Sequence, residues 1–552
     1  MTTRREFVGH LAALPLLAGI PRWRETPELI LVNGDLLTQN PAMPRAQAIA
    51  IANGHILAVG TNADMRRLSG PGTRIVDLGG KVVIPGVIDA HNHPAYAGRR
   101  HLFEVDCDLR SVGAIQAALR ERAAKTPAGT WIRGFKYDDT KTVERRFLTR
   151  ADLDAVSTTH PIYVEHRGGH TGYVNSLAYE RAGIDESSSD PKGGRFERDA
   201  VTGKLNGRVA EAAAQIISGA DKHSYTRAEI QAGVAEISRR LAAAGITSVT
   251  DALGTPDDLR GYQDARDAGQ LCTRVYCHIH YPYLDTMIDA GLRTGFGDEW
   301  VKIGAVKTTC DGSISERTAR LAEPYIGRPN DNGILVMDAD TLWPIFRKAH
   351  AAGWQLGTHT NGEVAIDLVA GLYERLQREM PRKDPRFRFE HCTVLTPDLI
   401  KRIKALGAIP TPFASYVYFH GEKMTEYGAA RTERMFPMRW FLDAGIPAAM
   451  GSDYPPGPFE PMMALTSMTT RTDIRGTTWG PSQKITLAEA LKVLTVNGAY
   501  ASYEEQVKGS LTAGKYADLV VLGSDPRTVP AIEIVNVKIE RTMVGGRWVY
   551  EA

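Results

Sequence analysis

The chain has 552 residues, more than one simple hydrophobic core usually accommodates. Its 66 basic and 64 acidic residues leave a formal net charge of +2, so the composition gives no indication of a nucleic-acid or strongly acidic partner. The five cysteines are sparse and contain no CxxC pair, which argues against a disulfide scaffold or a structural zinc ribbon.

The first 27 residues are predicted to form a twin-arginine-type signal segment. Arg4 and Arg5 precede an apolar run at residues 8–20 that is too short to cross a bilayer as a stable helix. This resemblance implies delivery by the twin-arginine (Tat) machinery to the periplasm or another extracytoplasmic compartment. The alternative is an ordinary N-terminal helix with chance arginines. No other apolar run is long enough, so no stable membrane span is expected.

Both ends of the chain are rich in predicted β structure. Short apolar or alternating runs separated by Asn-Gly and Gly-Gly pairs are typical of strands and hairpins. The runs lie at residues 29–32, 48–51, 55–59, 74–77, 517–522, 538–544 and 547–550, and the turn pairs at 33–34, 53–54, 79–80 and 545–546. We therefore expect one small β-sandwich domain formed from both termini, residues 28–84 and residues 506–552.

The middle of the chain, residues 85–505, alternates between predicted strands and helices. After a strand that ends near His91, strands are expected at residues 161–165, 247–251, 273–280, 301–308, 355–359, 386–390, 408–412 and 447–452. Helices are expected at residues 227–244, 256–268, 339–352, 363–379, 397–406 and 434–444. So many β-α units predict an α/β fold with a closed, TIM-type (β/α)8 barrel. The region of about 95–224 exceeds one unit and is interpreted as an insertion over the barrel mouth, with a polar loop at 185–202.

Residues 82–93 form an apolar, β-branched run that stops at two histidines. In a strand, residues i and i+2 point the same way, so His91 and His93 can direct two imidazoles at one point beyond the strand end. Neutral imidazole is a common ligand for zinc and similar ions. A metal site is one interpretation of this motif, and two unrelated surface histidines beside Pro94 are the other.

Four later strand ends carry groups of related chemistry. Lys307, His359, His391 and Asp453 each end a predicted barrel strand or directly follow one. Taken singly, each has an ordinary explanation, such as a salt-bridged lysine or a helix-capping aspartate. Barrel enzymes assemble their chemistry at the C-terminal ends of the strands. Their occurrence in chain order therefore favours one shared site.

This set of residues resembles the amidohydrolase superfamily of metal-dependent hydrolases. More narrowly, the chain is similar to the family 3 branch, which contains YtcJ-like proteins and N-substituted formamide deformylases. The resemblance extends over nearly everything after residue 28. The segments that support this branch lie at residues 169–176, 306–313, 317–319, 390–392, 451–453 and 508–519.

The resemblance implies a divalent-metal site with two ions per chain. His91 and His93 would hold one ion, and His359 and His391 would hold the second. Lys307 would bridge the ions as a carboxylated lysine, because an ammonium has no lone pair to offer a metal. The nitrogen-rich ligand set favours zinc first, with manganese or iron left open.

The implied reaction is hydrolysis of a C–N bond in an amide-like small molecule by a metal-activated hydroxide. Asp453 would contact a metal and serve as general base and then general acid. The same hydroxide would also attack esters, lactones or carbamates, which is a second enzymatic reading. A non-catalytic binding protein on a retained barrel is the alternative from a different class. The sequence is compatible with a homo-oligomer and leaves the oligomeric state open.

Three further residues are candidates for substrate contacts. His170 lies in the insertion and is a candidate for reaching the pocket; a locally bonded loop histidine is the alternative. Tyr416 lies in a segment, residues 411–420, that departs from the family's usual glutamine-proline-histidine pattern; it is a candidate for an aromatic substrate wall, and packing of the barrel rim is the alternative. Tyr454 stands where the branch usually has a small residue. Lys302 precedes Lys307 by five residues, so strand alternation predicts that it faces the other way.

Overall fold

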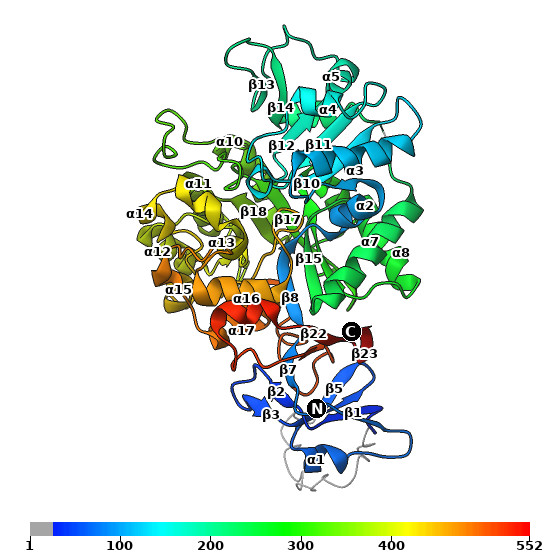
Figure 1. The fold of residues 1–552 in the computed structure, drawn as a ribbon. Helices are drawn as coiled ribbons and strands as arrows, with labels where there is room; N and C mark the ends of the chain where they lie inside the picture. Colours follow the sequence, from blue (N-terminus) through cyan, green and yellow to red (C-terminus); the bar gives the residue numbers. More distant parts are fainter. Residues whose placement is uncertain (1–25, 223) are drawn as a thin grey trace, which may run out of the picture.

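The computed structural model describes residues 26–222 and 224–552. The predicted signal segment, residues 1–27, therefore lies almost entirely outside the described residues. Figure 1 shows a central α/β part, an insertion at the top and a β-rich part at the bottom, to which the first and the last described strands belong.

The central part contains a seven-stranded parallel sheet in the order β20-β19-β18-β17-β16-β15-β8. Its strands are largely buried, as expected for a parallel sheet covered by helices. The sheet is nearly closed, which confirms the prediction of a TIM-type α/β fold at this level. Its strands are β8 (Val87–Asn92), β15 (Ile246–Gly254), β16 (Arg274–His280), β17 (Val301–Thr309), β18 (Leu356–Thr360), β19 (Arg388–His391) and β20 (Ile409–Thr411).

The predicted strand at residues 447–452 is not a strand in the structure; Gly451 makes only an isolated bridge to Phe413. The segment nevertheless lies between the two edge strands. The amide of Ala449 donates to the carbonyl of Pro410 at 3.0 Å, and the carbonyl of Met450 accepts from the amide of Ala90 at 2.8 Å. These bonds join β20 to β8 through an irregular segment, and Asp453 directly follows it.

Helices pack around this sheet (Figure 1). Two of them, α11 and α12, have the predicted bounds, whereas the helix predicted at residues 434–444 begins only at Met438, because Pro437 disfavours helix before it. The larger helices are α7 (Arg227–Ala243), α8 (Pro256–Asp267), α10 (Ala339–Ala351), α11 (Glu363–Glu379), α12 (Pro397–Leu406), α16 (Pro461–Thr470) and α17 (Leu487–Leu494). The shorter ones are α9 (Leu284–Asp289), α13 (Tyr416–His420), α14 (Ala429–Thr432), α15 (Met438–Asp443) and α18 (Val496–Ala501).

The insertion has its own six-stranded sheet, in the order β13-β14-β12-β11-β10-β9. The strand predicted at residues 161–165 is β11, which belongs to this sheet and not to the barrel, so its predicted place among the barrel strands is wrong. The polar loop predicted at residues 185–202 is wrong in part, because it contains strand β13. The elements are α2 (Pro94–Phe103), β9 (Val105–Asp106), α3 (Val112–Ala124), β10 (Ile132–Tyr137), α4 (Arg150–Asp154), β11 (Ile162–His166), β12 (Thr171–Val174), α5 (Ser176–Arg181), β13 (Gly194–Arg198), β14 (Leu205–Glu211) and α6 (Ala212–Ser218).

The two chain ends form two further sheets, β5-β4-β1-β6 and β23-β22-β21-β7-β2-β3. One buried apolar cluster contains residues of both sheets, such as Ile49 and Val521. The turns at residues 53–54 and 545–546 join paired antiparallel strands as predicted, but those at 33–34 and 79–80 connect strands of different sheets. The elements are β1 (Leu29–Val32), β2 (Asp35–Leu37), β3 (Arg45–Ala46), β4 (Ala48–Ala52), β5 (His55–Gly60), α1 (Asn62–Arg66), β6 (Arg74–Asp77), β7 (Val82–Pro85), β21 (Leu519–Leu522), β22 (Ile539–Val544) and β23 (Arg547–Glu551).

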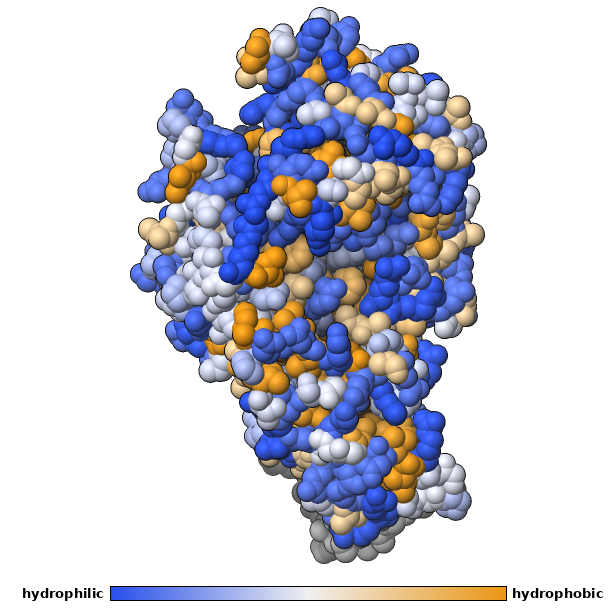
Figure 2. Space-filling view, in the orientation of Figure 1, coloured by the Kyte–Doolittle hydropathy of each residue, from blue (hydrophilic) through white to orange (hydrophobic). Residues whose placement is uncertain are grey.

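The face of the molecule seen in Figure 2 is largely hydrophilic, with hydrophobic residues in small groups. Among the described helices, none has both the length and the apolar character needed to cross a membrane. The five cysteines are all free, and four of them are buried.

Candidate metal centre

The six residues predicted as metal ligands all belong to the C-terminal ends of the barrel strands or to segments that directly follow them. Parallel strands bring these ends to one rim of the barrel. The residues are His91 in β8, His93 just after it, Lys307 in β17, His359 in β18, His391 at the end of β19 and Asp453 after the closing segment.

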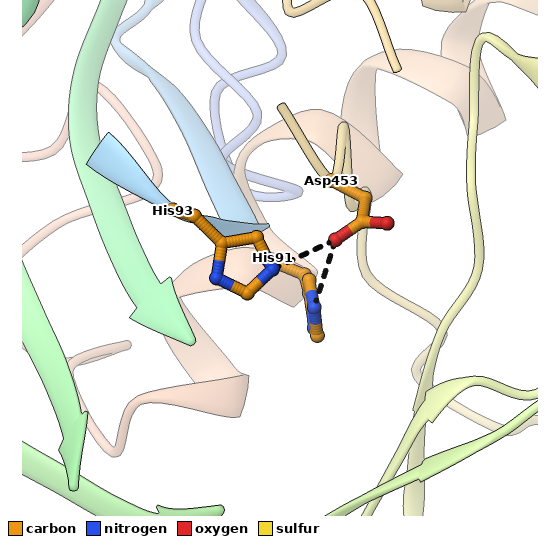
Figure 3. A group of neighbouring side chains, drawn as sticks. All are labelled: His91, His93 and Asp453. Atoms are coloured by element: carbon orange, nitrogen blue, oxygen red, sulfur yellow. Dashed lines mark hydrogen bonds and ion pairs between the residues drawn. The ribbon is translucent and has the colours of Figure 1, made fainter. Parts of the chain in front are cut away.

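His91, His93 and Asp453 form a compact group. Asp453 Oδ1 lies 3.0 Å from Nε2 of His93 and 3.3 Å from Nε2 of His91. Figure 3 shows both imidazoles directed at this oxygen. One ligand atom from each residue lies within 4.8 Å of the other two. Against the opposing effect of burial, the surrounding histidines hold the pKa of Asp453 well below its usual range, so the carboxylate is charged at neutral pH.

Two further imidazoles continue from this group. The ring centroids of His91 and His391 are 4.5 Å apart, and those of His391 and His359 are 4.4 Å apart. The ring of His93 lies 5.4 Å from that of His91 at the other end. Phe413 stacks on His391 with a centroid distance of 4.4 Å. The four imidazoles thus form an arc of side chains, which we call the histidine arc.

Two of the proposed ligands have an uncommon backbone conformation. The φ angle is 67° at His391 and 54° at Asp453, in the left-handed region that non-glycine residues seldom adopt. Such conformations persist where the surrounding structure imposes them, and they concentrate at functional sites. The hydrogen bond from the amide of Asp453 to the carbonyl of His91, at 2.7 Å, contributes to that constraint.

Lys307 is buried next to the histidine arc. Its amine has no hydrogen-bond or ion-pair partner among the described residues, although it interacts electrostatically with Asp453, Glu390 and His359. Burial lowers the pKa of its ammonium group. Lys302, by contrast, forms an ion pair with Glu504 at 2.8 Å.

Glu390 was not predicted as a site residue. Its Oε2 accepts a hydrogen bond from Nδ1 of His91 at 2.5 Å, and Arg388 and Thr411 also donate to this carboxylate. Because Nδ1 carries the proton, the lone pair of His91 lies on Nε2, which faces Asp453. Glu390 therefore orients His91 and fixes its tautomer.

Asp89 is a second residue that the sequence analysis missed. Its carboxylate accepts hydrogen bonds from the amide of Ser452 at 3.0 Å, from Nδ2 of Asn92 at 2.9 Å and from the amide of His91 at 3.2 Å. It thereby ties β8 to the segment that carries Asp453. Its position two residues before His91, on the same strand, was the available signal.

The residues present fit a bound divalent cation. Nε2 of His91 and Nδ1 of His391 are buried without a hydrogen-bond partner among the described residues, and such groups are costly unless something binds them. Asp138, Asp139 and His166 form a second group within ligand distance of one another. In that group, however, Lys423 Nζ lies 3.2 Å from Asp138 Oδ2 and already neutralises the carboxylate.

The three candidate substrate contacts differ in their positions. Tyr416 and Tyr454 are both buried, and their hydroxyl groups are bonded to Ser315 and His101, respectively. His170 has its ring centroid 5.8 Å from that of His359, next to the histidine arc.

The comparisons agree with this geometry. The amidohydrolase family model matches residues 74–550. The chain is 28% identical over 539 residues to an N-substituted formamide deformylase of Arthrobacter pascens, covering 95% of this chain and 98% of the relative. It is 28% identical over 520 residues to the putative amidohydrolase YtcJ of Bacillus subtilis, covering 92% and 96%.

Among solved structures, an uncharacterized metal-dependent hydrolase from Pyrococcus horikoshii aligns with a TM-score of 0.74 and 22% identity, covering 91% of this chain and 99% of that one. The chain belongs to the amidohydrolase family, and its resemblance to the YtcJ-like branch is confirmed. As a member of this family it is a metal-dependent hydrolase, and its candidate ligand group supports a divalent metal as the cofactor.

Proposed function

We propose that the protein hydrolyses a C–N bond of an amide-like small molecule at this centre. The proposal rests on the histidine arc, with the charged Asp453 against two of its rings. Beside it lies Lys307, whose amine has no hydrogen-bond or ion-pair partner among the residues that the structure describes. No predicted ligand is missing, which argues against a non-catalytic binding protein on the same fold.

Two zinc ions per chain suit this donor set. His91 and His93 would hold one ion and His359 and His391 the other, with Lys307 between them as a carboxylated lysine. A buried amine without a partner favours such a modification, since the product is an anionic oxygen ligand. When bound, such ions supply Lewis acidity, which acidifies water and polarises a carbonyl group.

Asp453 is proposed as the proton carrier. Its Oδ1 faces the imidazoles of His91 and His93, and its pKa is held low, so it is available as an acceptor. It would take a proton from the attacking water and deliver it to the leaving nitrogen. Amides require this delivery more than esters do, because an amide nitrogen leaves poorly without a proton.

The test uses purified wild-type protein and Asp453→Asn, with Asp443→Asn as a matched control at an exposed position. Metal content is measured first, and then turnover of a panel of N-substituted formamides, other amides, carbamates, lactones and esters. Asp453→Asn is expected to reduce kcat by about 10²–10⁴-fold, as loss of a general acid–base does, while the control retains activity. Wild-type protein without metal, or an unimpaired Asp453→Asn on a confirmed substrate, contradicts the mechanism.

Two proposals concern the chain ends. The two sheets of residues 28–84 and 506–552 are proposed to form a β-sandwich domain, supported by the apolar cluster that they share. Residues 1–27 are proposed to direct Tat export to an extracytoplasmic compartment, from the Arg4-Arg5 pair. Cell fractionation with Arg4-Arg5→Lys-Lys tests the export, which is contradicted if both proteins remain in the cytoplasm.

A further inference from the structure

His170 reaches the histidine arc from the insertion rather than from a barrel strand. It directly precedes β12, and its ring centroid lies 5.8 Å from that of His359. Its charge also acts on Asp453, at the other part of the centre. The insertion therefore contributes a side chain to the space above the proposed metal ligands.

Three contacts hold His170 in this position. Nδ1 of the ring lies 3.0 Å from Oε2 of Glu211. The backbone amide of His170 donates to Oε1 of Glu316 at 3.1 Å, and its carbonyl accepts from the amide of Glu211 at 2.8 Å. Glu316 lies in the segment that follows β17, so it links the insertion to the barrel.

The backbone of Glu211 is strained in a way that serves this contact. Glu211 ends β14 with a φ of 52° and a ψ of −122°, where non-glycine residues are rare. Conformations of this kind are found where the surrounding structure imposes them, often at functional sites. Here the strained residue is the one whose carboxylate pairs with His170.

The second ring nitrogen of His170 is free for a ligand. Nε2 has no hydrogen-bond partner in the part of the chain that the structure describes, and the side chain is 20% exposed. The carboxylate of Glu211 holds Nδ1, which leaves Nε2 as the ring nitrogen that can donate to a bound ligand. This combination is typical of a group that contacts a substrate.

We propose that His170 is a further catalytic residue, whose Nε2–H binds the carbonyl oxygen of the substrate and stabilises the charge that develops on it. This inference rests on the proposed hydrolysis. Water adds to the carbonyl carbon, the π electron pair moves to the oxygen beside His170, and Asp453 takes the proton of the water. The oxygen then re-forms the double bond as the C–N bond breaks, and the nitrogen receives the proton from Asp453.

Two substitutions separate the donor from the anchoring of the side chain. In His170→Asn the amide can still donate to Glu211 but no donor remains near the position of Nε2, whereas in His170→Gln the longer side chain places a donor there. His160→Asn is the matched control, because His160 is another buried histidine of the insertion whose partners are hydroxyl and carbonyl groups.

The proteins are loaded with zinc, and their metal content, thermal midpoint and turnover of the substrate panel are measured. The affinity for methylphosphonate, a tetrahedral oxyanion, provides a readout that needs no substrate. His170→Asn is expected to lower kcat by about 10²-fold or more and to weaken methylphosphonate binding, with unchanged metal content. His170→Gln is expected to retain much of both activities.

Full turnover and full methylphosphonate affinity in metal-loaded His170→Asn would overturn the role of His170 and leave the proposed hydrolysis intact. If the wild-type protein turns over no member of the panel, the methylphosphonate affinities alone decide the inference. Failure of the wild-type protein to bind metal would overturn both proposals together. An equal loss in His160→Asn would assign the effect to the fold of the insertion and reject the catalytic role.

Discussion

The proton on Nδ1 of His91 is held by Glu390, a contact between residues 299 positions apart in the chain. Such a carboxylate raises the basicity of the imidazole and orients it toward a metal. Burial raises the pKa of the Glu390 carboxyl group, but Arg388 and His91, with His278, together hold it well below its usual range, so the group stays charged inside the barrel. Metal affinity should therefore depend on Glu390 although it is not itself a ligand.

We predict that Glu390→Gln lowers metal affinity by about 10–100-fold, as loss of such partners of metal-bound histidines usually does. Competition with a chromogenic chelator measures the affinity. Glu504→Gln is the control, since it also removes a buried carboxylate, but one that pairs with Lys302 away from the histidine arc. Equal metal affinity in Glu390→Gln and the wild-type protein would contradict this role.

At the residue scale, the sequence predicted the proposed ligands better than their partners. All of the proposed ligands except Asp453 lie near or just after the C-terminal end of a strand, and strand ends can be located from local apolar runs. Glu390 directly precedes His391, yet alternation along one strand cannot reveal that it meets His91 from another strand across the barrel. The contact of His170 with Glu211 likewise depends on a sheet that the sequence did not reveal.

Within strand β17, two lysines five residues apart have different surroundings. Lys307 lies beside the histidine arc with no hydrogen-bond or ion-pair partner in the described part of the chain, whereas Lys302 pairs with Glu504, which also binds Lys508 at 2.6 Å. Burial opposes ionisation of Glu504, but Lys508 and Lys302 hold its pKa at about 2. This carboxylate therefore fastens β17 to the segment after α18.

We predict that Glu504→Gln destabilises the protein by about 3 kcal/mol at neutral pH, because it leaves the buried ammonium group of Lys508 and the partly buried one of Lys302 without a counter-charge. Since the folded pKa is depressed, this stability is present above the ordinary pKa of about 4.5 and is lost as the pH falls toward 2. The difference in thermal midpoint from the wild-type protein should shrink over that range. Glu505→Gln, at a more exposed neighbour, should have a smaller effect, and a pH-independent difference would contradict the assignment.

At the element scale, long and strongly patterned helices such as α11 and α12 could be predicted to the residue. The insertion sheet could not, because its strands are short and β12 pairs with β14, which follows only after α5 and β13 in the chain. The turn at residues 79–80 was taken for a hairpin, since a Gly-Gly pair signals a change of direction but not which sheet the next strand joins.

The proposed ligands come from separate strands around the barrel, so a bound metal links parts of the chain that are remote in sequence. A ligand that binds only the folded state stabilises it by about 2.7 kcal/mol when its free concentration is 100 times Kd. We predict that removal of metal with a chelator lowers the thermal midpoint and that added zinc restores it. Differential scanning fluorimetry measures both changes, and an unaltered midpoint after complete metal removal would contradict the prediction.

At the scale of the whole molecule, the alternation of strands and helices was sufficient to predict the α/β barrel and the contribution of both ends to one β-rich region. It was not sufficient to predict how the barrel closes. Residues 447–452 have the sequence pattern of another barrel strand. In the structure, the backbone hydrogen bonds of this segment to β20 and β8 are too irregular to make it a strand.

The position of β7 has a consequence for how the protein is made. In its sheet β7 lies between β2 and β21, with Val83 paired to Val521, and it leads almost directly into β8 and the proposed ligands. A nascent chain leaves the ribosome with its N-terminus first, so β7 emerges early and β21 emerges among the last residues. The backbone groups of β7 that pair with β21 therefore remain unpaired, and accessible to other strands or to chaperones, until translation is nearly complete.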